Sequence, residues 1–175
     1  MTPDILIGFC KGTALLSRII EWFTGGGPSH VFILYRSEDF GGWVSIGSEA
    51  KGWIPLPAES MENVTDLYSI PGLDLRKGLR ASRPDLCANY DIGGLLGMSW
   101  VMVAWRFLGK KVRNPLLTLG AWFCSEAAAL VVRRSDGILT LGPGETDPLR
   151  FQEEIVSVFS ATKVTDRAAY PVKWK

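Results

Sequence analysis

The sequence predicts an α+β protein with a small antiparallel sheet packed against helices. Short segments rich in β-branched and aromatic residues are bounded by turn residues, as strands are. Other segments repeat apolar residues with helical spacing. The strands cluster along the chain and do not alternate regularly with helices, which argues against a parallel doubly wound sheet. With 175 residues, 47% of them hydrophobic, the chain suits one core, so we expect a single domain over residues 1–175.

The N-terminal half predicts one helix and three strands. Residues 4–10 are a short apolar strand, and apolar residues recur at 15, 16, 19, 20 and 23, which predicts an amphipathic helix over 15–23. A Gly-Gly-Gly-Pro sequence ends that helix. Residues 30–35 and 43–46 then predict a hairpin around a turn at 39–42, and residues 64–70 predict a third strand.

The C-terminal half predicts a polar connection followed by helices. Residues 73–83 are basic and predict a solvated connecting segment, after which a helix begins at Pro84 and runs through Tyr90. The apolar stretch 92–108 is shorter than the roughly 20 residues that a membrane-spanning helix needs, and it carries apolar residues all round. We therefore expect a buried helix there, with Trp100, Trp105 and Phe107 in the core.

The last third predicts one more helix and a final strand. Small and aliphatic residues at 127–132 indicate a buried helix that ends near the Ser-Asp-Gly at 135–137. Residues 146–154 predict a turn or short helix, and the β-branched residues at 155–159 predict the last strand.

Composition excludes several functions. A net charge of +1 lacks the basic field on which nucleic-acid binding depends, so no nucleic-acid partner is expected. The three cysteines, Cys10, Cys87 and Cys124, are an odd number, which disfavours a disulfide framework and suits a reducing compartment. No secretion signal is predicted, so we expect a cytoplasmic or phage-associated protein. No zinc-ligand spacing or phosphate loop is present, and no cofactor or metal is expected.

Cys124 and His30 are the two residues most suited to chemistry. Cys124 precedes a predicted helix, whose N-terminal dipole and amide groups stabilise a thiolate and an oxyanion. His30 is the one histidine, and it begins a predicted strand, where it can act as a general base. Glu49, at the end of the neighbouring strand, can orient the imidazole, and Ser45 and Ser48 are weaker candidates for this role. On spacing alone, Cys124 can equally be an inert core residue, which is what we expect of Cys10 and Cys87. In the same way, His30 can be a histidine whose hydrogen bonds are satisfied at a strand edge, and Glu49 can be a solvated carboxylate.

Several motifs occur in the order found in one known group of enzymes. They are Pro28-Ser29-His30-Val31-Phe32-Ile33, Glu49-Ala50-Lys51-Gly52-Trp53-Ile54, Tyr90-Asp91, Trp122-Phe123-Cys124-Ser125-Glu126 and Asp147-Pro148. Together they resemble the circularly permuted papain-like peptidases and amidases of the NlpC-like superfamily, over about residues 4–160. Each motif is short and moderately specific, and residues 93–119 match none of them.

The resemblance implies a permuted papain-like fold with a catalytic triad. In it Cys124 is the nucleophile at a helix N-terminus, His30 the base and Glu49 the orienting residue. Ser29, Tyr90 and Trp122 would contact the substrate, and Tyr90 could also steady the oxyanion.

Three functions follow as hypotheses. The first is a thiol hydrolase that cleaves an amide bond in a peptide or acyl-amide substrate, for example in a cell-wall peptide. The second keeps the chemistry but acts on lipids, as acyltransferases and phospholipases of the wider group do, and involves peripheral membrane contact, which we favour less. The third is a non-catalytic binding module that retains the fold.

Overall fold

The computed structural model describes residues 3–13, 15–49, 52–85, 100, 104, 107, 123–142 and 146–175. Within these residues the chain is α+β, with a six-stranded antiparallel sheet and four α-helices. The strand order is β4-β3-β2-β1-β5-β6. The strands are β1 (Ile5–Cys10), β2 (His30–Ser37), β3 (Gly42–Glu49), β4 (Gly52–Pro57), β5 (Val64–Ser69) and β6 (Thr162–Lys163). The helices are α1 (Leu15–Phe23), α2 (Leu75–Ala81), α4 (Cys124–Arg134) and α5 (Pro148–Phe159).

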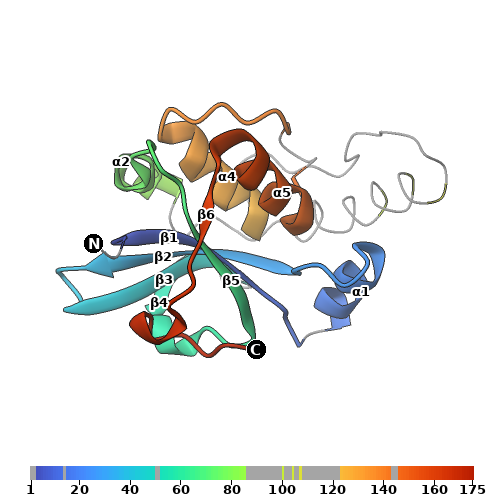
Figure 1. Ribbon diagram of the computed structural model, residues 1–175, viewed down its shortest axis with the longest axis horizontal. Helices are drawn as coiled ribbons and strands as arrows, with labels where there is room; N and C mark the ends of the chain where they lie inside the picture. Colours follow the sequence, from blue (N-terminus) through green and yellow to red (C-terminus); the bar gives the residue numbers. More distant parts are fainter. Residues whose placement is uncertain are drawn as a thin grey trace.

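The helices are distributed unequally around the sheet. Figure 1 shows α2, α4 and α5 on one face, while α1 lies beyond one end of the strands, next to the start of β2. On the other face lie two short 3₁₀ helices, η1 (Ala58–Ser60) and η3 (Arg167–Ala169), the latter in the C-terminal segment. Both faces of the sheet are therefore covered.

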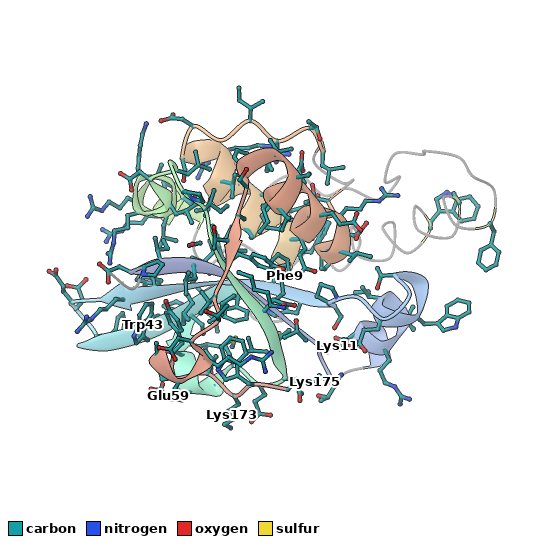
Figure 2. The ribbon with its side chains drawn as sticks, viewed as in Figure 1. Phe9, Lys11, Trp43, Glu59, Lys173 and Lys175 are labelled. Atoms are coloured by element: carbon teal, nitrogen blue, oxygen red, sulfur yellow. The ribbon has the colours of Figure 1, made fainter. Side chains whose placement is uncertain are left out.

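The face toward α4 and α5 holds the larger core. Ile7, Phe9 and Val31 of the central strands pack with Phe151 and Ile155 of α5, and Figure 2 shows Phe9 between the sheet and these helices. The Phe9 ring also meets the Tyr68 ring edge-on. Alternation along the strands sends every second side chain to this face.

The opposite face forms a second core under the C-terminal segment. Leu6, Phe32 and Leu34 point to this side and pack with Tyr170 and Val172. The ring of Trp43, labelled in Figure 2, meets the Tyr170 ring edge-on at a centroid distance of 5.2 Å. The chain end is tied to the sheet by backbone hydrogen bonds, because Val64 N donates to Lys173 O and Lys175 N donates to Val64 O. Both strand faces are thus apolar along the middle of the sheet.

The predicted strands in the N-terminal half and the helix over 15–23 are confirmed, as is the helix that ends near residue 135. The strand β4 was not predicted. Its second half contains two prolines, Pro55 and Pro57, and it pairs with β3 at the sheet edge, where missing proline N–H groups cost little.

The prediction of a solvated connection over 73–83 is wrong, because residues Leu75–Ala81 form α2. Asp74 caps this helix by accepting a hydrogen bond from Lys77 N at 3.0 Å. Leu75 and Gly78 are buried while the basic residues face outward, so the helix has one narrow apolar face. The predicted helix from Pro84 overlaps η2 (Arg83–Asp85), and the rest of it lies outside the described residues.

The predicted strand at 155–159 is also wrong, because it is the second half of α5. Phe151 and Ile155, four residues apart, are both fully buried on one helix face, whereas Val156 and Val158 are 43% and 47% exposed. Asp147 caps this helix, with its Oδ1 accepting hydrogen bonds from Leu149 N and Arg150 N. Burial at helical spacing therefore overrides the β-branched composition.

Trp100 and Phe107 are 54% and 63% exposed, so the prediction that they lie in the core is wrong. Ala104, between them, is fully buried. Trp105 and the remainder of residues 93–119 lie outside the described residues. None of the helices in the described ranges is both long and apolar enough to cross a membrane.

Gly78→Ala should destabilise the protein although alanine is the better helix former. A Cβ at Gly78 would lie 2.1 Å from Ser135 Oγ and 2.2 Å from the Val131 carbonyl oxygen of α4. We expect an overpacking cost of about 1 to 3 kcal/mol, larger than the gain in helix propensity, measured as a lower melting temperature. Gly42→Ala is the control, because nothing lies within 4 Å of its Cβ position. A rise in melting temperature for Gly78→Ala would contradict the packing of α2 on α4.

Candidate functional site

The corner where β1 leads through α1 to β2 is held by Ser29. Gly12 N donates a hydrogen bond of 2.8 Å to Ser29 Oγ, and Ser29 Oγ donates one of 3.1 Å to Glu21 Oε1 of α1. Ser29 is only 3% exposed. Its hydroxyl therefore fixes the approach to His30 from both sides, and a contact of Ser29 with substrate stays a prediction.

His30 is the first residue of β2 and lies opposite Cys10, the last residue of β1. Its Nε2 is buried. Burial lowers the pKa of the imidazole to about 4, because desolvation disfavours the charged ring. At neutral pH the ring is therefore uncharged and can accept a proton, although as a weaker base than an exposed imidazole.

Glu49 is the last residue of β3, and the strand register places it next to His30. Phe32 lies opposite Gly47, and continuing this antiparallel pairing by two residues brings Glu49 opposite His30. The structure describes Glu49 at the level of its backbone only. Directly opposed residues have Cβ atoms about 5 Å apart, so the extended register predicts that these two candidate site residues are neighbours.

Cys124 is the first residue of α4, with Phe123 at the N-cap position. The first amide groups of a helix have no partner within it, and together with the helix dipole they favour negative charge at this position. Cys124 is 6% exposed and belongs to the core cluster that contains Phe9 and Val31. The start of α4 therefore packs into the same core as Val31, the residue that follows His30.

The N-termini of α4 and α5 and the start of β2 meet at the same end of the sheet. Ser125 Oγ donates a hydrogen bond to the Thr146 carbonyl oxygen just before α5. A Cβ at Gly27, three residues before His30, would lie 3.2 Å from Leu149 in the first turn of α5. Further along α4, Ala127 and Val131 share a core cluster with Ile33 of β2. The sequence positions chosen for the triad thus converge at one end of the fold.

The pleat nevertheless assigns His30 and Cys124 to opposite faces of the sheet. Cys10, the register partner of His30, packs with Phe32 and Leu34 on the face away from α4. A Cβ at Gly47 would lie 3.4 Å from both His30 Nε2 and Phe32 Cβ, which puts the ring on that face too. In the structure His30 therefore lies on the same face as Cys10, a proximity that the sequence analysis did not predict.

His30 and Cys10 also share a polar cavity of about 350 Å³, called here the His30 cavity. Its wall continues from Lys11 and Ser17 to Glu62 and Asn63 in the loop before β5. Figure 2 shows Lys11 at this end of the sheet, just beyond β1. Sequence reasoning missed this cavity because it depends on the β1 and β2 register. The available signal was that one strand ends in a cysteine and the next begins with a histidine.

The remaining predicted residues contribute less to the described site. Tyr90, Trp122 and Cys87 lie outside the described residues. Ser45, a weaker candidate for orienting the imidazole, is buried, and its hydroxyl donates a hydrogen bond to the Leu56 carbonyl oxygen at 3.2 Å. Within the described ranges no three His, Cys, Asp or Glu side chains are grouped to hold a metal ion.

The chemistry available here is nucleophilic and acid–base. Two buried thiols and one neutral imidazole lie at the same end of the sheet, and one thiol begins a helix. Such groups suit attack on an acyl carbon. No protein-family model matches this sequence, and no match was found among curated proteins.

The imidazole of His30 should titrate near pH 4. Since it is the only histidine, its ring protons give one unambiguous set of signals in an NMR titration. Because the unfolded chain binds this proton from pH 6.5 downward and the folded chain does not, stability should fall as pH drops from 6.5 to about 4. The loss is on the order of 3 kcal/mol, and His30→Gln should remove this part of the pH dependence of urea unfolding. A midpoint near 6.5 would show that the ring is solvated.

Proposed function

We propose that this chain is a thiol hydrolase that cleaves an amide bond, with Cys124 as nucleophile, His30 as general base and Glu49 as the residue that orients the imidazole. The observation that carries the proposal is the convergence of three element ends. The first residue of α4, the first residue of β2 and the last residue of β3 lie at the same end of the sheet. The same arrangement supports a permuted papain-like fold.

The proposed reaction requires the imidazole to reach from its own face of the sheet to Cys124 at the sheet end. His30 accepts the Cys124 proton, and the thiolate attacks the amide carbon while the backbone N–H of Cys124 stabilises the oxyanion. The imidazolium then protonates the leaving amine, and the acyl group remains on sulfur as a thioester. Water, deprotonated by His30, hydrolyses the thioester and regenerates the thiol. Every proton taken up by the ring is returned within the cycle.

Cys10 competes with Cys124 for the same imidazole. It lies directly opposite His30 and lines the same cavity, which favours it by position. It lacks the helix N-terminus that favours a thiolate at Cys124. Since both thiols are 6% exposed, accessibility does not bias a comparison of their reactivity.

Iodoacetamide should therefore alkylate Cys124 faster than Cys10 or Cys87 at neutral pH, as mapped by mass spectrometry. The helix field raises the thiolate fraction at Cys124, and thiolate is the reactive form. His30→Gln should slow the labelling of Cys124. In parallel, release of new amino groups from cell-wall peptides should be abolished in Cys124→Ala and retained in Cys10→Ala.

The two cysteine variants serve as each other's control, since each removes one equally buried thiol. If Cys10 is labelled first and His30→Gln slows that reaction, the nucleophile assignment is wrong. If Cys124→Ala keeps full amide-cleaving activity, the proposed mechanism fails.

Exposed aromatic residues favour a second candidate, a lipid-directed thiol enzyme. Trp22 of α1 is 65% exposed, in addition to Trp100 and Phe107. Large exposed apolar side chains that gather on one surface commonly mark a contact with a partner or a membrane. The chemistry at Cys124 would be unchanged, with an acyl lipid in place of the amide.

This second candidate predicts that the intact chain co-sediments with vesicles containing anionic lipid. Replacing Trp100 and Phe107 together by serine should abolish sedimentation, because their apolar insertion contributes to binding. Neutralising Lys110, Lys111 and Arg113 or raising the salt concentration should weaken it. Phe40→Ser is the control, since Phe40 is 69% exposed on the turn between β2 and β3, at the other end of the sheet. Equal loss in the control, or no sedimentation of the wild type, would exclude the lipid-directed function.

A further inference from the structure

The helix α2 presents two faces of different chemistry. Gly78 approaches α4 so closely that its Cβ position falls within 2.2 Å of the Val131 carbonyl oxygen. Leu75 and Ser82, on the same side, are buried. Arg76, Arg80 and the following Arg83 are spaced by four and three residues, so they share the outward face. Packing of Gly78 on α4 thereby fixes the direction in which this arginine row points.

The arginine row lines a cavity between α2 and the end of the β2–β3 hairpin, called here the arginine cavity. It has a volume of about 210 Å³. Tyr35 and Arg36 of β2 form the facing wall, and the hairpin turn contributes Glu38 and Asp39. The pleat turns the Arg36 side chain to the opposite face, with Leu34, so three arginine side chains and two carboxylates surround this small space and leave a net charge of +1 on its walls.

Ion pairs among the described residues neutralise this charge only in part. Arg76 donates a hydrogen bond of 3.1 Å to the Arg36 carbonyl oxygen and lies 4.0 Å from Asp4. Within the described part of the chain, Arg36, Arg80 and Arg83 form no ion pair with Glu38, Asp39 or another carboxylate. Like charges held around one cavity repel each other, and a bound anion relieves that repulsion.

The cationic side chains of the wall, Arg76, Arg80 and Arg83, are all arginines. A guanidinium group offers a planar fork of donors that matches the oxygens of a phosphate or carboxylate, whereas a lysine provides a point charge. Lys77, in the same helix, does not line the cavity and pairs with Asp136 instead. The cationic side chains of this wall are therefore of the type that suits binding an oxyanion.

Tyr35 adds a hydroxyl donor to the wall. Burial raises the pKa of its phenol, while the positive charges of Arg83 and Arg76 oppose that shift. The hydroxyl therefore stays protonated at neutral pH, and it lies within the electrostatic field of two of the arginines. A neutral donor among guanidinium groups is a further partner for an oxyanion oxygen.

We propose that the arginine cavity binds a phosphate group of an anionic ligand, held by Arg76, Arg80 and Arg83 together with the Tyr35 hydroxyl. The three guanidinium groups supply donors for the phosphate oxygens, and the volume suits a phosphate with a small attached group and not a drug-sized molecule. The site is separate from the proposed catalytic residues. Tyr35 lies five residues along β2 from His30, roughly 16 Å at the rise of a strand, at the opposite end of the sheet (Figure 1).

The test is calorimetric titration of the full chain with inorganic pyrophosphate, at an ionic strength held constant with chloride. We expect saturable binding by the wild type and a loss of affinity of roughly tenfold or more in Arg83→Gln and in Arg80→Gln, because each removes a charge-assisted hydrogen bond. Lys77→Gln is the matched control, since it removes one positive charge from the same helix outside the cavity. Its affinity should stay within about twofold of the wild type, as expected for a screened surface charge.

A second arm identifies the source of the phosphate. Vesicles of phosphatidylcholine with and without phosphatidic acid are compared with soluble glycerol phosphate, and binding in either form that is lost in Arg83→Gln supports the site. Without ligand, Arg83→Gln should melt at or above the wild-type temperature, because repulsion is relieved, whereas a purely structural arginine would give a lower melting temperature. The proposal is overturned if neither phosphate source binds, or if Lys77→Gln weakens binding as much as the cavity variants. The alkylation rate of Cys124 should be unaffected, so this result is independent of the proposed hydrolase.

Discussion

The pairing of β1 with β2 is the contact on which the rest of the structure depends. These two strands lie at the centre of the sheet and are joined only by α1 and a short glycine-rich turn. Their register sets which side chains face α4, and it places His30 against Cys10 at one end and Tyr35 against Ile5 at the other. A slip of one residue would turn the side chains of the shifted strand to the other face of the sheet. Because both faces are buried under separate cores, such a slip would be costly, and the positions of both candidate sites are thereby fixed.

Small residues then decide how closely the helices approach this sheet. Ala127, Ala128 and Ala129 follow Cys124 and Glu126 in the first turns of α4, and they let the start of that helix lie directly on the strands. Gly78 does the same where α2 meets α4. One packing contact therefore positions a thiol at the helix N-terminus, and the other turns an arginine row away from the core and toward the β2–β3 hairpin. The chemistry of each site therefore depends on neighbouring residues that have small side chains or none.

The sequence predicted most of the central fold, because its strands and its α1 and α4 helices carry clear periodicity and turn residues. The sequence analysis predicted a strand in place of the second half of α5, because Ile155 and Val156 have strand propensity. In the structure, Phe151 and Ile155 are buried at helical spacing. The sequence analysis failed for α2 because an apolar face reduced mainly to Leu75 and Gly78 gives too weak a signal beside three basic residues. For the site, the order of the motifs indicated Cys124, His30 and Glu49 as candidate catalytic residues. The proximity of Cys10 to His30 could not be predicted from those motifs, because it depends on strand register.

The basicity of His30 is the constraint that the proposed chemistry must meet. Charging a ring whose pKa is about 4 costs about 4 kcal/mol at neutral pH, which would slow proton transfer from the thiol. The proposed triad therefore requires Glu49, two register positions beyond the Phe32–Gly47 pair, to stabilise the imidazolium that forms during proton transfer. The pleat adds a second requirement, since the imidazole must also reach around the first residue of β2 to meet Cys124. Cys10 needs no such movement but lacks the helix field. The choice between the two thiols is therefore a balance between the helix N-terminus, which stabilises the thiolate, and the strand register, which supplies the base.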